Sequence, residues 1–120
     1  MGRSIDISAK GKKLNVKYPL DRFYGVSALL QNIHYIREMR FTRGDYDASI
    51  LLIDFVDSLH EAELTDRQKF VLQLIFIEGK SQYEVARKLN ITQQAVSDHI
   101  NSAIARIAAV NKQKEDRSGV

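Results

Sequence analysis

The residues best suited to a binding function are four polar side chains late in the chain: Gln93, Gln94, Ser97 and Asp98. Their spacing puts them on one face of a helix, opposite Val96 and Ile100. In the major groove of DNA, glutamine can pair with adenine through two hydrogen bonds, aspartate can accept one from cytosine N4, and serine can act in either role. This face therefore has the donors and acceptors needed to read bases, although it carries no arginine or lysine.

The segment that contains these residues has the spacing of a helix-turn-helix. Such a motif needs a small residue in its first helix, a turn residue with positive φ four positions later, and an apolar residue six positions further on. Ala86, Asn90 and Val96 meet these requirements, and Ser81 and Thr92 are suitable caps for the two helices. The remaining core positions are apolar, namely Val85, Leu89, Ile91 and Ile100. The pattern favours DNA binding over a purely structural helical hairpin.

Apolar periodicity predicts a pair of helices before the motif. The first begins at Asp21 and is expected to bury a stripe of Phe23, Val26, Leu29, Leu30, Ile33 and Ile36. The second is expected to bury Ile50, Ile53, Val56 and Leu59. Asp54 and Asp57 then point to solvent.

A third helix is expected directly before the motif. Thr65 and Gln68 fit a capping box, in which each side chain bonds the other residue's free backbone N–H group. We expect this helix to be largely buried through Phe70, Val71, Leu74, Ile75 and Ile77. Gly79 should end the helix by adopting a left-handed conformation.

The last helix is predicted to run long. Its apolar stripe comprises Val96, Ile100, Ala103, Ile107 and Val110. The sequence thus predicts an all-α chain with a basic arm (1–20), an N-terminal helical pair (21–60), a three-helix domain containing the helix-turn-helix (61–110), and a polar tail that frays (111–120).

The segment from about Ala62 to Val110 resembles region 4 of the sigma-70 family, the domain by which bacterial sigma factors read the −35 promoter element. The matching positions are Leu64, Thr65 and Gln68 at the opening, Glu84, Val85, Ala86 and Leu89 in the next helix, and the cap Thr92. The resemblance implies that RNA polymerase is a partner. Residues 1–60 show no pattern of region 2, which melts the −10 element. We therefore expect a regulator similar to the small sigma-like proteins of phages and prophages in Gram-positive bacteria, which control late genes.

The lack of cations on the base-reading face leaves the source of affinity open, because phosphate contacts supply most nonspecific binding. The candidates for phosphate contacts are Lys80, Arg87, Lys88, Thr92 and Arg106. The basic arm, which holds Arg3, Lys10, Lys12, Lys13 and Lys17, is a second source. RNA polymerase as a tether, or a homodimer formed through residues 21–60, would be a third.

Other sites have weaker support in the sequence. Asp45–Asp47 begins like a calcium loop, but Ile50 stands where glycine is needed, so helix capping explains it better. Asp54, Asp57 and Glu61 fit a solvated helix face, and the three histidines lack the spacing of metal ligands. We expect no catalytic site, cofactor or metal.

The composition is that of an ordinary globular protein. The 120 residues are 44% hydrophobic and 28% charged, with a formal net charge of +3 and no cysteine. The apolar runs are too short to span a membrane, so a cytoplasmic protein is expected. The sigma-70 resemblance further implies a bacterial, nucleoid-associated protein.

Two other functions remain open from the sequence. One is a dimeric DNA-binding protein of the repressor or recombination-accessory kind. The other is a module that docks on polymerase without reading sequence. Gln94→Ala should relax sequence preference in the reading proteins and leave the docking module unaffected.

Overall fold

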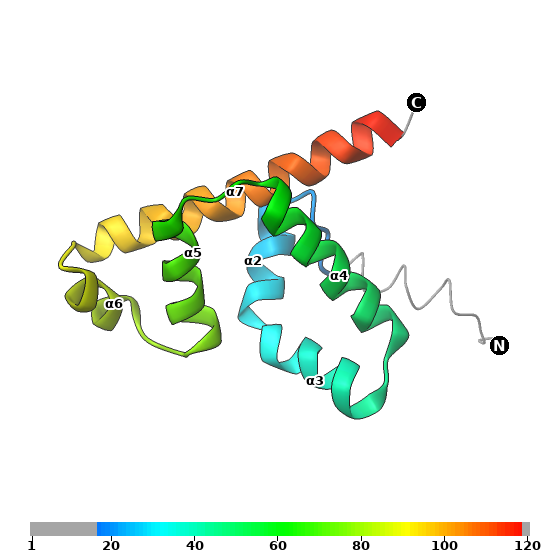
Figure 1. Cartoon of the computed structure of the whole chain (residues 1–120), viewed down its shortest axis with the longest axis horizontal. Helices are drawn as coiled ribbons and strands as arrows, with labels where there is room; N and C mark the ends of the chain where they lie inside the picture. Colours follow the sequence, from blue (N-terminus) through cyan, green and yellow to red (C-terminus); the bar gives the residue numbers. More distant parts are fainter. Residues whose placement is uncertain (1–16, 119–120) are drawn as a thin grey trace.

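The computed structural model describes residues 17–118, which form helices and no strand (Figure 1). The elements are α2 (Phe23–Gln31), α3 (Ile33–Arg43), α4 (Tyr46–Glu61), α5 (Asp66–Leu72), the π-helical segment η1 (Gln73–Ile77), α6 (Gln82–Leu89) and α7 (Gln93–Ser118). The predicted all-α fold is confirmed. The predicted basic arm lies, up to residue 16, outside the described residues.

The long helix α7 is the element on which the others assemble. Figure 1 shows α5 and α6 against its N-terminal half and α2 and α4 against its C-terminal half, and α7 contacts all four. The predicted stripe is confirmed, because Val96, Ile100, Ala103 and Ile107 are buried and Val110 is half-buried. Ile104 and Ala108 are also buried, since α7 has neighbours on more than one side. The helix therefore joins the N-terminal helices to the helix-turn-helix.

The first predicted helix is divided in two at Asn32. The Asn32 side chain donates a hydrogen bond to the Ala28 carbonyl oxygen at 2.9 Å, and its backbone leaves the helical region with ψ of 18°. The predicted stripe is buried on both sides of this break, as Val26, Leu29, Leu30, Ile33 and Ile36. Phe23, expected in the same stripe, is 45% exposed. From residue 17 to residue 61 the structure thus has α2, α3 and α4, and α3 is capped by Gly44 in a left-handed conformation of φ 64°.

The face that α4 buries was predicted wrongly. The buried residues are Ala48, Leu51, Leu52, Phe55 and Ser58, and Leu59 is half-buried. Ile50, Ile53 and Val56 are 41%, 49% and 46% exposed. Because α4 has apolar residues on two faces, periodicity alone does not decide between them. The small residues Ala48 and Ser58 allow close packing on the face that is buried.

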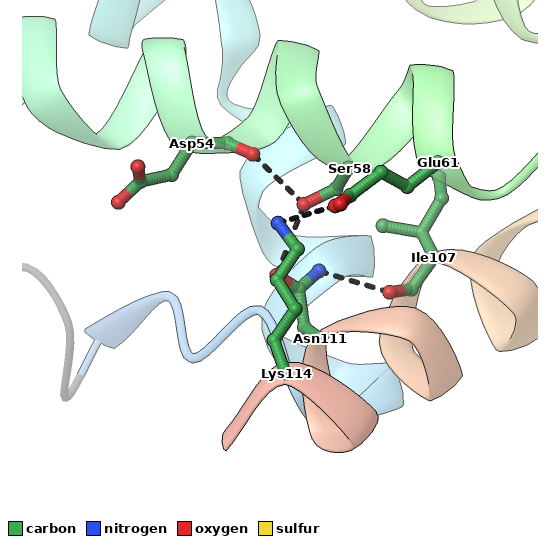
Figure 2. Close-up of polar contacts among 6 residues, drawn as sticks. All are labelled: Asp54, Ser58, Glu61, Ile107, Asn111 and Lys114. Carbon is green, nitrogen blue, oxygen red and sulfur yellow. Dashed lines mark hydrogen bonds and ion pairs between the residues drawn. The ribbon is translucent and has the colours of Figure 1, made fainter. Parts of the chain in front are cut away.

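The polar end of α7 was predicted to fray, but the helix continues to Ser118. Figure 2 shows how this end contacts α4. The buried Ser58 hydroxyl lies 2.8 Å from the Asp54 carbonyl oxygen and 3.0 Å from Asn111 Oδ1, either of which can accept its single proton. Lys114 forms an ion pair with Glu61 at 2.5 Å. Asn111 and Lys114 therefore pack against α4, although their polar character had suggested a tail without contacts.

The helix before the motif begins and ends as predicted. Thr65 and Gln68 form the complete capping box, and Gly79 adopts φ 75°. The expected burial is only partly observed, because Val71 and Leu74 are buried and Ile75 is half-buried, whereas Phe70 and Ile77 are 39% and 42% exposed. The last turn widens into η1, where the Glu78 N–H donates to the Gln73 carbonyl oxygen at 3.0 Å, five residues back.

Gly25 allows α2 to lie directly against the backbone of Pro19. A Cβ atom at this position would come within 1.9 Å of the Pro19 carbonyl oxygen. Glycine to alanine inside a helix usually stabilises by about 1 kcal/mol, but here we expect Gly25→Ala to lower the free energy of unfolding by about 1–3 kcal/mol. Urea denaturation followed by circular dichroism measures the change. Gln31→Ala, at an exposed position of the same helix, is the control, and equal stability of the two variants would contradict the expectation.

Candidate nucleic-acid interface

The turn between α6 and α7 has the geometry that the sequence predicts. Asn90 adopts the left-handed conformation, with φ 58° and ψ 48°, and the Ile91 N–H donates to the Ala86 carbonyl oxygen at 2.9 Å. The Thr92 hydroxyl oxygen accepts from the Ala95 N–H at 3.0 Å and thereby caps α7. The start of α7 is therefore held in a defined orientation relative to α6.

The start of α6 is fixed by a second capping box. The Ser81 N–H donates to the Glu84 carboxylate at 2.9 Å, and the Glu84 N–H donates to the Ser81 hydroxyl oxygen at 3.1 Å. The first of these bonds holds the pKa of Glu84 below its usual value. Because this pKa is lowered by folding, the resulting stabilisation is present above the ordinary carboxyl pKa and is lost as the pH falls through the lowered value.

The predicted core of the motif is assembled as expected. Val85, Ala86, Val96 and Ile100 are buried, and Leu89 and Ile91 pack against them half-buried. On the opposite face of α7, Gln93, Gln94 and Asp98 are exposed and Ser97 is half-buried. The structure thus places all four predicted base-reading residues in the first two turns of one helix, with Ser97 the least accessible.

Two of these four residues contact each other. Gln94 Nε2 donates a hydrogen bond to Asp98 Oδ1 at 2.9 Å. The contact fixes the orientation of the amide, leaving its oxygen and its second N–H hydrogen available for a partner in a bidentate pair. The sequence placed Gln94 and Asp98 on one face, and their spacing of four residues was the signal for this contact.

The predicted phosphate-contacting residues fall into two groups. Lys80, Arg87, Lys88 and Thr92 belong to the helix-turn-helix or to the loop before it. Arg106 is separate, since thirteen residues of helix place it about 20 Å along α7 from Gln93. Its Nε donates to the Ala62 carbonyl oxygen at 2.8 Å, at the C-terminal end of α4. This bond gives Arg106 a structural contact that sequence reasoning missed.

Arg87 is positioned by a residue that sequence reasoning did not assign to the site. Its Nη1 donates to the Tyr83 hydroxyl oxygen at 3.2 Å, and its guanidinium lies 5.8 Å from the centre of the Tyr83 ring. The i, i+4 spacing on α6 could have indicated this pair. The contact holds the Arg87 charge on the exposed surface of the motif.

Residues 17–118 provide no alternative metal site, since they contain no cluster of histidine and acidic side chains able to hold an ion. Asp45 accepts a hydrogen bond from the Ala48 N–H at 3.0 Å, which confirms the capping interpretation of the 45–47 segment. Within the same residues, none of the helices is long and apolar enough to cross a membrane.

Comparison with known protein families gives a match for part of the chain. Residues 62–109 match the family model described as Sigma-70, region 4. The match covers α5, η1, α6 and α7 up to Ala109. The match supports a helix-turn-helix domain similar to sigma-70 region 4 in this part of the chain, and it suggests a DNA-binding function related to transcription. Comparisons with curated proteins and with solved structures gave no significant match.

Proposed function

We propose that this protein is a non-enzymatic transcription regulator that recognises specific DNA sequences and acts at promoters together with RNA polymerase. The observation that carries the proposal is the exposed, capped start of α7, with Gln93, Gln94 and Asp98 on one face of a region 4-like domain. The small sigma-like regulators of phage and prophage late genes are the proteins that this combination fits best. In this proposal the protein acts in the bacterial cytoplasm on the nucleoid.

The base contacts follow from the side chains at the start of α7. Gln93 and Gln94 offer amides that can pair with adenine N6 and N7. Asp98 is the acceptor for cytosine N4 and also orients the Gln94 amide through their 2.9 Å hydrogen bond. Ser97, being half-buried, is the weakest contributor of the four. Recognition would therefore favour sites with adenine near the start of α7.

The affinity must come partly from outside this face, because the face has no cation. In this proposal the flanking phosphates are contacted by Lys80, Arg87, Lys88 and the Thr92 hydroxyl, which belong to the helix-turn-helix or to the loop before it. A tether to RNA polymerase would raise the effective concentration of the domain at promoters without adding any base contact. Alone, the protein should bind DNA weakly.

Selection of binding sites from random duplex DNA tests the proposal. We expect the wild-type chain to enrich one motif and the Gln93→Ala, Gln94→Ala variant to lose it. Gln113→Ala is a matched control, because Gln113 is an exposed glutamine on the same helix, beyond the region 4 match. Failure of the wild type to enrich any motif would favour the alternative of a polymerase-docking module that does not read sequence.

The phosphate contacts predict a distinct salt dependence for two groups of cations. Arg87→Ala and Lys88→Ala should each reduce the slope of log affinity against log salt by about 0.9, since each removes one phosphate contact. Arg106→Ala should leave the slope unchanged while lowering stability, because its Nε holds the end of α4. Fluorescence anisotropy across a salt series measures the slopes. A reduced slope for Arg106→Ala would show instead that Arg106 contacts a DNA phosphate.

Asp98→Ala should raise affinity for nonspecific DNA while lowering the preference for the selected motif. Removing the carboxylate relieves repulsion from nearby phosphates, so affinity for nonspecific DNA should rise about twofold to fivefold. The same change releases the Gln94 amide, so preference for the selected motif should fall. Competition binding with specific and nonspecific duplexes measures both quantities. If affinities for the specific and the nonspecific duplex changed by the same factor, the preference would be unchanged and Asp98 would not orient Gln94 for reading.

A further inference from the structure

A groove with a volume of about 850 Å³ lies between the N-terminal helices and the region 4-like domain. Its walls are mainly apolar, with Leu52, Phe55 and Leu59 from α4 facing Leu72 and Phe76 from α5 and η1. The cations that line it are Arg37, Arg40 and Lys69, and the only carboxylate among its lining residues is Glu63. The π-helical segment η1 forms part of one wall, and such segments are frequent at functional sites.

Helix α4 extends this apolar surface out of the groove. Val56 lines the groove yet is 46% exposed, and Ile53, one turn earlier, is 49% exposed. Asp57 lies beside them, four residues after Ile53 on the helix surface. The acids of α4 are Asp47, Asp54, Asp57 and Glu61, and it contains no lysine or arginine. The outer side of α4 is therefore an apolar ridge on an acidic helix, next to an apolar groove with a basic rim.

We propose that this groove is a self-association site, in which the Ile53–Val56 ridge of a second copy of the chain is the occupant. In an antiparallel pair about a two-fold axis, each α4 would lie between α4 and α5 of the other copy, so that both grooves are filled at once. Asp57 of each copy then lies near Arg37 and Lys69 of the other. The surface is thus complementary to itself in both polarity and charge.

The chain offers a less suitable occupant in its own N-terminal residues. Residues 1–16 contain Arg3, Lys10, Lys12 and Lys13 against a lone Asp6. Their positive charge has the same sign as the rim of the groove, so this segment would be repelled where α4 of a second copy is attracted.

Self-association goes beyond the proposed DNA recognition and does not depend on it. A dimer would carry two copies of α7 and hence two sets of base contacts, which offers one source of the affinity that the reading face lacks. Self-association is measured in the absence of DNA, so a monomeric wild type would refute self-association without refuting DNA recognition.

Sedimentation equilibrium of the full chain over about a hundredfold range of concentration tests the proposal. The wild type should move from the 13.7 kDa of one chain toward twice that mass. Val56→Asp should remain a monomer, because it places a charge in the apolar contact. Tyr24→Asp should dimerise like the wild type, since Tyr24 is an exposed residue of α2 that lies neither on α4 nor in the groove. Circular dichroism checks that both variants are folded.

A charge exchange makes the test specific to this surface. Asp57→Lys alone should weaken the dimer at least tenfold, and so should the Arg37→Glu, Lys69→Glu double variant, because each pairs like charges. An equimolar mixture of the two should form a heterodimer, since both contacts are then between opposite charges. A wild type that stays monomeric, a Val56→Asp variant that still dimerises, or a mixture that fails to associate would each overturn the proposal.

Discussion

Ile107→Ala is expected to lower the free energy of unfolding by about 2–5 kcal/mol, the largest stability effect of any substitution considered. Ile107 is fully buried in α7. The residues around it bind α4, because Arg106 donates to the Ala62 carbonyl oxygen and Asn111 lies 3.0 Å from the Ser58 hydroxyl. Removing the Ile107 side chain leaves a cavity where the two parts of the chain meet.

Urea denaturation measures this loss. The same substitution at Ile50, which is 41% exposed, is the control and should change stability by less than about 0.5 kcal/mol. If the variant kept wild-type stability, or if the N-terminal helices and the helix-turn-helix unfolded in separate transitions, α7 would not be the joint that the packing indicates.

The largest effect on DNA binding is expected from the Gln93→Ala, Gln94→Ala double variant. Each bidentate contact with a base contributes about 1–3 kcal/mol of discrimination, so losing two should reduce the preference for the selected site by about 30-fold or more. Affinity for nonspecific DNA should stay nearly unchanged, because neutral side chains replace neutral ones and no phosphate contact is lost.

Competition binding measures this preference as the ratio of specific to nonspecific affinity. Gln113→Ala should keep the wild-type ratio. An equal loss of specific and nonspecific affinity in the double variant would mean that the two glutamines support the domain and do not read bases.

The helix-turn-helix could be predicted closely because its signals are local. The capping box at Thr65, the caps at Ser81 and Thr92, and the positive φ of Asn90 and Gly79 each depend on a few neighbouring residues, and all are observed. The exposed face proposed to read bases follows from the same local phase, since burial of Val96 and Ile100 fixes which residues of α7 are exposed.

The N-terminal helices were harder to predict because their arrangement depends on distant contacts. Both faces of α4 have apolar residues, and packing against α3 and α7 determines that Leu51 and Phe55 are buried while Ile50 and Ile53 are not. The break at Asn32 and the contact between Asn111 and Ser58 likewise need the assembled structure to be seen. The 53 residues between Ser58 and Asn111 place that contact beyond any periodicity argument.

The most direct test of the central claim, that the start of α7 reads promoter sequence, is genome-wide DNA occupancy in the native host. The wild type would be compared with the Gln93→Ala, Gln94→Ala variant and with Gln113→Ala. We predict sharp peaks at a small set of promoters for the wild type and for Gln113→Ala, and their loss in the double variant. Peaks wherever RNA polymerase sits, unchanged in the double variant, would contradict the account and identify the region 4-like domain as a docking module.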